Sequence, residues 1–255
     1  MDFSLPFASR SPVMARNVVA TSQPLATQAG LAALAKGGTA VDAALAAAIT
    51  LTVVEPTMNG LGGDLFALIW DGKRLHGLNA SGRAPAAWTA QRFAGQEKMP
   101  PIGWDSVTVP GAVSGWVALS EQFGNLPFGD LFEAGVRHAR EGFPVSPVIA
   151  RQWEIATGQL ADQPGFRDAF MPKGRAPRPG ETWRFQEQAS TLEEIAATRG
   201  KSFYRGRLAK AIAQFARQTG GALDESDLAA HQCDWVEPIG HDYRGFTVHE
   251  IPPNG

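Results

Sequence analysis

Several residue types and patterns are scarce in this sequence, and each scarcity excludes a class of protein. Cys233 is the only cysteine among 255 residues, so an internal disulfide and a zinc cluster of thiolates are both excluded. Charge of neither sign dominates, because 23 basic residues stand against 25 acidic ones and the formal net charge is -2. The basic residues are also scattered, whereas binding to phosphates requires clustered lysine and arginine. We therefore expect no nucleic-acid partner.

Long hydrophobic runs are missing as well. The most apolar stretch, residues 43–54, is too short to cross a bilayer, and its many alanines are typical of a buried helix. The first residues, Met1 to Pro6, contain neither the basic region nor the apolar region of a secretory signal. We therefore expect no membrane partner and a cytoplasmic location.

Side chains in catalytic or metal-binding patterns are equally scarce. No histidine has the spacing of a metal-binding motif, and each of the five is interpreted as a surface or satisfied residue: His76, His138, His231, His241 and His249. The Gly-x-Ser-x-Gly motif of a serine nucleophile does not occur. Cys233 has no evident base beside it and is expected to be an unreactive, partly buried thiol. The residues by themselves predict no metal site and no catalytic triad.

The order of the expected elements indicates an α+β fold. Residues 1–23 are expected to form an extended arm, and residues 81–108 and 154–182 to be irregular. Helices are expected where apolar residues recur at helical spacing between plausible caps, over residues 25–36, 39–54, 111–123, 130–141, 190–199 and 208–220, with another short helix starting at Asp227. Strands are expected over residues 65–70, 73–80 and 246–251. Such an order favours layers of helix and sheet over regular βαβ alternation.

Two features of these elements carry particular predictions. The turn Asp71-Gly72 between two strand-like runs indicates a hairpin. Its first strand is apolar on both faces and is therefore expected to be covered on both sides. Ser190 to Glu193 fits a capping box that opens the helix ending at Arg199.

The glycine turn Gly60-Leu61-Gly62-Gly63 follows a helix and precedes a strand, the reverse of the order in a dinucleotide-binding loop. We expect close backbone packing there, because glycine permits positive φ and lets another segment approach. Glu55 and Asp64 bracket the turn and could form a pair of carboxylates for acid–base chemistry. The alternative, which we favour, is that Glu55 caps or pairs locally and Asp64 holds the loop through backbone hydrogen bonds.

The residues around this turn carry a family resemblance. The segment Val53-Val54-Glu55-Pro56-Thr57-Met58-Asn59-Gly60-Leu61-Gly62-Gly63 resembles the hallmark of the gamma-glutamyltranspeptidases, in which Val-Glu-Pro leads into a Gly-[Ile/Leu]-Gly-Gly turn. Further segments occur in the order of that family, among them Lys36 to Ala44, Val109-Pro110-Gly111, Gly124 to Pro127, Gly142 to Ser146 and Asp242 to Phe246. The resemblance covers roughly residues 13 to 255.

The resemblance implies a fold and a mechanism. The fold would be the four-layer αββα sandwich of N-terminal-nucleophile hydrolases, incomplete in this chain, with residues 1–255 forming the N-terminal part of one domain. Such precursors cut themselves before a threonine, which becomes the nucleophile, while its free α-amine serves as base. No cofactor is implied. The partners would be the rest of the large subunit and the small subunit from the same precursor, together with a small gamma-glutamyl or related amide substrate.

The resemblance also implies that the chemistry lies outside these residues. In the family, the segment Pro252-Pro253-Asn254-Gly255 falls well inside the large subunit, so the threonine nucleophile is expected downstream of Gly255. We expect no catalytic residue within the chain and no activity from the chain alone.

Ser81 and Arg83 are the candidate substrate-binding residues. True transpeptidases carry an arginine after the hairpin that holds the α-carboxylate of the gamma-glutamyl group, as the planar guanidinium suits. Alignment through Ala84-Pro85 puts Ser81 at that position, and Arg83 lies two residues later, on the same face of a strand. Arg83 is interpreted either as a substitute for that arginine or, the alternative we favour, as a structural ion-pair partner.

Three functions remain open. The first is a gamma-glutamyl hydrolase or transferase. The second is an acylase of the cephalosporin-acylase type acting on another amide, which the Ser81 departure favours. The third is a stand-alone relative without catalytic activity.

Overall fold

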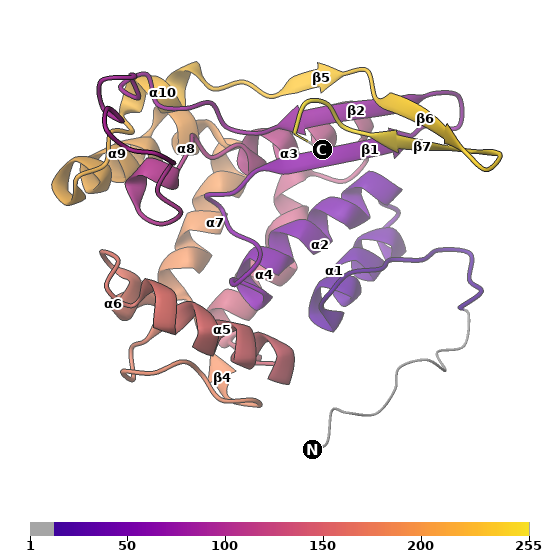
Figure 1. Ribbon diagram of the computed structural model, residues 1–255. Coiled ribbons are helices and arrows are strands. Elements are labelled where there is room, and N and C mark those ends of the chain that lie inside the picture. Colours follow the sequence, from indigo (N-terminus) through magenta and orange to yellow (C-terminus); the bar gives the residue numbers. More distant parts are fainter. Residues whose placement is uncertain (1–12, 255) are drawn as a thin grey trace.

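The computed structural model describes residues 13–254, and Figure 1 shows how their helices and strands are arranged. Of the arm expected over residues 1–23, residues 1–12 lie outside the described part. Residues 13–23 form neither helix nor strand and lead into the first helix, α1 (Pro24–Ala35). No helix between residues 13 and 254 is both long enough and apolar enough to cross a membrane.

Helices α1 and α2 (Ala40–Val54) pack against each other, and α2 is buried along most of its length. Small residues allow the approach, since a Cβ on Gly30 would lie 2.9 Å from the carbonyl oxygen of Ala43. The predicted start of α2 is confirmed. Thr39 Oγ1 accepts a hydrogen bond from the N–H of Asp42 at 3.2 Å, and the Asp42 carboxylate accepts one from the N–H of Thr39 at 2.8 Å. These two bonds form a capping box.

The predicted hairpin is the core of a three-stranded antiparallel sheet. Strands β1 (Leu65–Trp70) and β2 (Leu75–Ala80) are joined by the turn at Asp71-Gly72. They pair in antiparallel register, with Leu65 opposite Ala80 at the end farthest from the turn. A strand that was not predicted, β5 (Asp234–Val236), pairs antiparallel with the other edge of β2. The neighbour of β2 at this edge of the sheet is therefore a strand that lies far away in the sequence.

The sheet is covered on one face. Helix α3 (Ala112–Phe123) packs on it, and a Cβ on Gly115 would lie 2.9 Å from Leu65 Cδ2. On the other face Phe66, Leu68 and Trp70 are 45%, 41% and 64% exposed. The expectation that β1 is covered on both faces is thus wrong among the described residues. An apolar run on both faces cannot by itself show which face is packed.

The remaining helices lie below the sheet or, for the last three in the chain, beside it as drawn in Figure 1, and they complete the core together with α2 and α3. They are α4 (Glu133–Glu141), α5 (Pro147–Leu160), α6 (Phe166–Phe170), α7 (Gln186–Thr198), α8 (Lys201–Arg205), α9 (Arg207–Thr219) and α10 (Glu225–Ala230), with 3-10 turns η2 (Trp104–Ser106) and η3 (Phe128–Phe132). The largest fully buried side chains of the molecule include Trp116 of α3 together with Phe132 and Trp153. Two further antiparallel pairs complete the structure: β3 (Phe143–Pro144) pairs with β4 (Thr182–Trp183) across the segment that contains α5 and α6, and β6 (Ile239–Tyr243) forms a hairpin with β7 (Phe246–Glu250).

Three element predictions are wrong. Residues 154–182 contain the end of α5 and all of α6, because their prolines lie between and after the helices and not within them. The proposed capping box at Ser190 lies inside α7, where the Ser190 and Thr191 hydroxyls donate to carbonyls one turn earlier. Helix α10 is capped by Asp224, so it starts before Asp227, which completes the capping box as its third residue. The α+β class is confirmed, while the four-layer sandwich stays a prediction.

Candidate functional site

The predicted site residues lie at the end of β2, where its backbone packs closely against the segment before α3. A Cβ on Gly82 would lie 1.5 Å from the carbonyl oxygen of Val109, and one on Gly111 would lie 1.9 Å from that of Ala80. A backbone hydrogen bond also joins the two segments, from Val109 N to Arg83 O at 3.0 Å. Only glycine fits at these two crossings. They hold the end of β2 in place beside the N-terminus of α3.

Ser81 and Arg83 both lie at this corner, but they contact different groups. The Ser81 hydroxyl donates to Asn254 Oδ1 at 3.3 Å, and Asn79 donates to the same oxygen at 2.7 Å. The Arg83 guanidinium lies 3.6 Å from the carboxylate of Asp234, and both side chains are largely exposed, at 68% and 63%. A pair so long and so exposed contributes little to stability. Arg83 therefore keeps most of its hydrogen-bonding capacity.

The glycine turn departs from its prediction. None of Gly60, Gly62 and Gly63 has positive φ, and a Cβ on Gly62 would meet nothing within 4 Å. Neither positive φ nor a close neighbour therefore requires glycine at Gly62, although the backbone of another segment does approach the turn at Gly63. The turn instead offers its backbone, since Gly63 O accepts from the N–H groups of Gly111 and Ala112 at 3.0 and 2.9 Å.

The bracketing carboxylates follow the favoured alternative only in part, because Glu55 and Asp64 also contact residues 33 and 18 positions away in the sequence. Glu55 is buried and accepts from the Ser22 hydroxyl and, at 3.3 Å, from the Asn59 amide. Asp64 accepts from the N–H of Gly82 at 3.1 Å. Each carboxylate thus serves a separate structural contact, and the contacts give no support to an acid–base pair.

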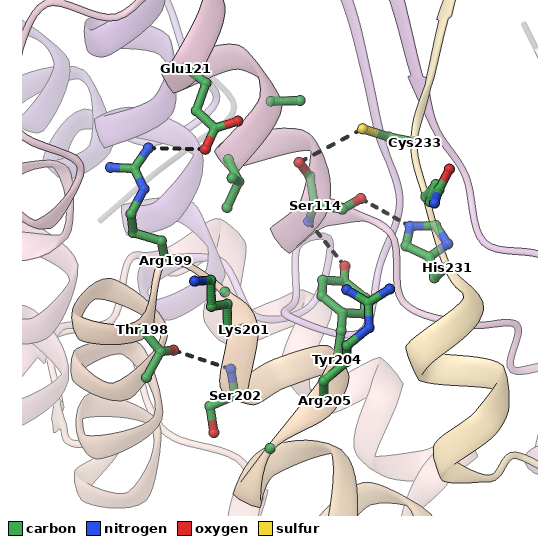
Figure 2. A pocket seen from close by; sticks show the side chains of 15 residues that line it. Ser114, Glu121, Thr198, Arg199, Lys201, Ser202, Tyr204, Arg205, His231 and Cys233 are labelled. Atoms are coloured by element: carbon green, nitrogen blue, oxygen red, sulfur yellow. Dashed lines mark hydrogen bonds and ion pairs between the residues drawn. The ribbon is translucent and has the colours of Figure 1, made fainter.

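A second group of polar residues, which sequence reasoning missed, lines a cavity of about 970 Å³ between α3, the α7–α8 junction and the segment after α10 (Figure 2). We call it the α3–α8 cavity. Ser114 from α3, Tyr204 from α8 and His231 converge there. Ser114 N–H donates to the Tyr204 hydroxyl at 3.0 Å, and that hydroxyl donates to Pro110 O at 2.8 Å. Ser114 lies 90 positions from Tyr204 and 117 positions from His231 in the sequence, so no sequence motif connects the three residues.

The Ser114–His231 contact resembles a catalytic dyad, but in a dyad the serine would donate its proton to the histidine, and here it does not. Ser114 Oγ lies 2.9 Å from His231 Nε2 and donates its one proton to Gly111 O at 2.7 Å. Nε2 must therefore carry a proton and donate to Ser114. The other ring nitrogen, Nδ1, is buried and has no partner in the described part of the chain. Ser114 consequently has no base to activate it.

Burial controls the charge of the groups around this cavity. It lowers the pKa of the His231 imidazole below its usual 6.5, and the nearby positive charge of Arg83 lowers it further. Burial also raises the pKa of Tyr204 to about 12 and raises that of the Cys233 thiol. All three side chains are therefore neutral at neutral pH. The unreactive thiol predicted for Cys233 agrees with this environment.

The other four histidines do not contribute to this cavity. His76 contacts the Asp71 carboxylate at 2.7 Å. His138 is half-buried on α4, and burial together with Arg137 lowers its pKa. His241 and His249 lie on the exposed β6–β7 hairpin. Among residues 13–254, no group of three or more His, Cys, Asp or Glu side chains could hold a metal ion.

Comparison with known proteins decides the family. The family model described as gamma-glutamyltranspeptidase matches residues 26–255, nearly the whole chain. The chain belongs to the gamma-glutamyltranspeptidase family. The predicted resemblance is thereby confirmed, together with the family's hydrolase and transferase character.

Members of the gamma-glutamyltranspeptidase family with different names resemble the chain. It is 38% identical to the glutathione hydrolase-like YwrD proenzyme of Bacillus subtilis, covering 96% of the chain and 47% of that protein. It is 34% identical to the acylase ACY 1 proenzyme of a Pseudomonas species, covering 93% and 45%. The crystal structure of cephalosporin acylase from Bacillus halodurans matches with a TM-score of 0.88 and 48% identity, over 99% of this chain and 50% of that one. The chain thus spans about half the length of these relatives.

Proposed function

We propose that the protein containing this chain is an amide hydrolase or transferase of gamma-glutamyl compounds that processes itself and uses a threonine nucleophile. Family membership supports this, and two of the relatives are named as proenzymes. In the proposed reaction the threonine hydroxyl attacks the amide carbonyl, its proton passes through the α-amine to the departing amine, and water then releases the acyl group. In this proposal the threonine lies downstream of Gly255 as the first residue of the small subunit, because cleavage before it frees the α-amine that serves as base.

Within the chain, the proposed role is to hold the acyl group of the substrate. The observation that carries it is the exposed Arg83 guanidinium, whose one ion pair is long and solvent-screened. A guanidinium in this state can exchange Asp234 for a substrate carboxylate and make two parallel hydrogen bonds to it. Ser81, two residues earlier, carries a hydroxyl at the same corner.

An acylase acting on another amide is the second candidate. Ser81 stands where true transpeptidases carry the carboxylate-binding arginine, and relatives named as acylases match as well as those named as glutathione hydrolases. The two candidates differ in whether the amino group of the gamma-glutamyl moiety is required.

Three anilides that differ by one group each separate these candidates. They are gamma-glutamyl anilide, glutaryl anilide, which lacks the amino group, and butyryl anilide, which also lacks the carboxylate. We expect the full-length protein to prefer gamma-glutamyl anilide. Preference for glutaryl anilide would support the acylase, and no turnover of any of the three would contradict both.

The role of Arg83 is tested by Arg83→Ala in the same protein. Loss of a charged hydrogen bond is expected to raise KM for the two anilides that carry a carboxylate by about tenfold or more. The kinetics of butyryl anilide should not change. Asp234→Ala is the matched control, because it removes the ion pair and leaves the guanidinium. An unchanged KM in Arg83→Ala would remove Arg83 from the site.

A further inference from the structure

The α3–α8 cavity concentrates positive charge in a chain that is acidic overall. Four of its lining residues are charged, three of them cations and one an anion: Arg199, Lys201, Arg205 and Glu121. The whole chain has a net charge of -2. The cavity therefore carries a local excess of positive charge that the rest of the sequence does not share.

Most of that charge is not neutralised by the protein. Arg199 pairs with Glu121 at 3.3 Å, as Figure 2 shows. Arg205 donates to the carbonyl oxygen of Ala229 at 2.6 Å, which is a neutral acceptor. Lys201 has no ion-pair partner among residues 13–254. Two cations at the rim of one cavity repel each other, and a bound anion would relieve that repulsion.

The rest of the cavity is suited to an uncharged, partly apolar body. Val117 and Ala118 of α3 line it, and the Tyr204 ring stacks on His231 with centroids 5.3 Å apart. Neither Tyr204 nor His231 is charged at neutral pH, and the one carboxylate among the lining residues, Glu121, pairs with Arg199. Asp234 lies nearby without lining the cavity, and it pairs with Arg83. A volume of about 970 Å³ lies within the usual range for small-molecule sites.

We propose that the α3–α8 cavity binds a small organic anion, with a carboxylate or phosphate on Lys201 and Arg205 and an apolar body against Val117 and Ala118. This site is independent of the proposed function, because neither Ser81 nor Arg83 lines it. It is also independent of any activity, since occupancy can be measured directly.

Calorimetric titration of the full-length protein tests the proposal with three probes: phenylacetate, phenyl phosphate and the neutral phenylacetamide. We expect saturable binding of at least one anion and about tenfold weaker binding of the amide. The tighter of the two anions identifies the head group. Equal affinity for phenylacetamide, or no saturable binding of either anion, would overturn the proposal.

Paired variants locate the bound probe. Lys201→Gln with Arg205→Gln should weaken anion binding about tenfold or more, whereas Lys210→Gln with Arg217→Gln, which removes the same charge from exposed positions on α9, should not. Ala118→Phe should weaken it by filling the cavity without changing charge. Equal effects of the two double variants would mean unspecific attraction. Because the charge of Arg83 also acts on His231, Arg83→Ala should weaken binding less than the Lys201→Gln with Arg205→Gln variant. A larger loss in Arg83→Ala would place the probe at the other corner, and either result would refute the site.

Discussion

At the scale of single residues, Gly82 shows how much the corner beside α3 depends on a missing side chain. Its backbone has no positive φ, so the requirement is purely one of space, with the Val109 carbonyl where a Cβ would be. The same holds for Gly111 against Ala80. Neither neighbour is a flexible side chain that could move away.

Gly82→Ala is therefore expected to lower the free energy of unfolding by about 3 kcal/mol, through overpacking against a fixed backbone. Gly158→Ala is the matched control. Gly158 lies within α5 with nothing near its Cβ position, so alanine there should stabilise by about 0.5–1 kcal/mol. Denaturant titration of both variants measures the difference. A Gly82→Ala protein as stable as the parent would contradict the close approach.

His231 gives a prediction for the pH dependence of stability. Burial lowers the pKa of this imidazole in the folded state, so below about pH 6.5 the unfolded chain binds more protons than the folded one. Stability is therefore full above that pH and is lost as pH falls through the folded pKa. His138, whose pKa burial also lowers, contributes in the same direction.

His231→Gln should accordingly reduce the loss of unfolding free energy between about pH 7.5 and about pH 5, because one of the two groups is removed. The glutamine amide can still donate to Ser114. His241→Gln, a change on an exposed strand, serves as control and should leave the pH profile as it is. A His231→Gln profile parallel to that of the parent would show that this imidazole is not buried.

At the scale of elements, the chain contains two capping boxes built from aspartates in different surroundings. Asp42 is fully buried and also accepts from the N–H groups of Asn125 and Leu126, so it ties the start of α2 to the loop after α3. Asp224 caps α10 at the surface, where its partners are local. The same capping motif thus links two distant segments in α2 and only caps the helix locally in α10.

Asp42→Asn should cost about 3 kcal/mol of unfolding free energy, because several bonds to a buried carboxylate weaken together. Asp224→Asn should cost about 1 kcal/mol or less, since asparagine is also a good cap and the site is exposed. Thermal and denaturant unfolding measure both. Equal costs would mean that the loop contacts of Asp42 contribute nothing.

The elements were predictable where the signal is local. The Thr39 cap, the Asp71-Gly72 hairpin and the helix ending at Phe123 follow from residues within one turn of each boundary. Strand β5 was missed because it is three residues long and exists through its pairing with β2. The second half of helix α5 is not evident from the sequence, because the prolines that suggest an irregular segment all lie beyond its end.

The sequence was enough to propose which residues form the candidate site, but it could not predict their surroundings. The motif position of Ser81 and Arg83 could be found by resemblance, but the partners Asn254 and Asp234 come from segments far away in sequence. The convergence of Ser114, Tyr204 and His231 has no sequence signal at all. His231 could have been singled out only by knowing that it is buried.

At the scale of the whole molecule, an apolar face of the sheet is open among the described residues. Phe66, Leu68 and Trp70 project from it, and the β6–β7 hairpin adds exposed apolar side chains: Ile239, Tyr243, Phe246 and Val248. Large exposed apolar side chains gathered on strand faces are usually part of a contact surface. In the proposed precursor, the rest of the polypeptide covers it.

Residues 1–255 produced alone are therefore expected to self-associate and to leave gamma-glutamyl anilide unchanged. Sedimentation velocity should show oligomers, and replacing Phe66, Leu68 and Trp70 by threonine should shift them toward monomer. The control replaces three exposed apolar residues on helices by glutamine: Leu31, Val148 and Ile155. A parent chain that sediments as a monomer, or that turns over the anilide, would contradict this picture.

The hydrogen bond between Asn79 and Asn254 has a consequence for biosynthesis. Its partners are separated by 175 positions, and Asn254 is also what the Ser81 hydroxyl contacts. At typical rates of translation, the ribosome needs roughly 9 to 35 s to make the intervening chain. During that interval the end of β2 has no partner on this side, while α1 and α2 can already pack. The corner proposed to hold the acyl group is thus among the last parts of the nascent chain to take shape.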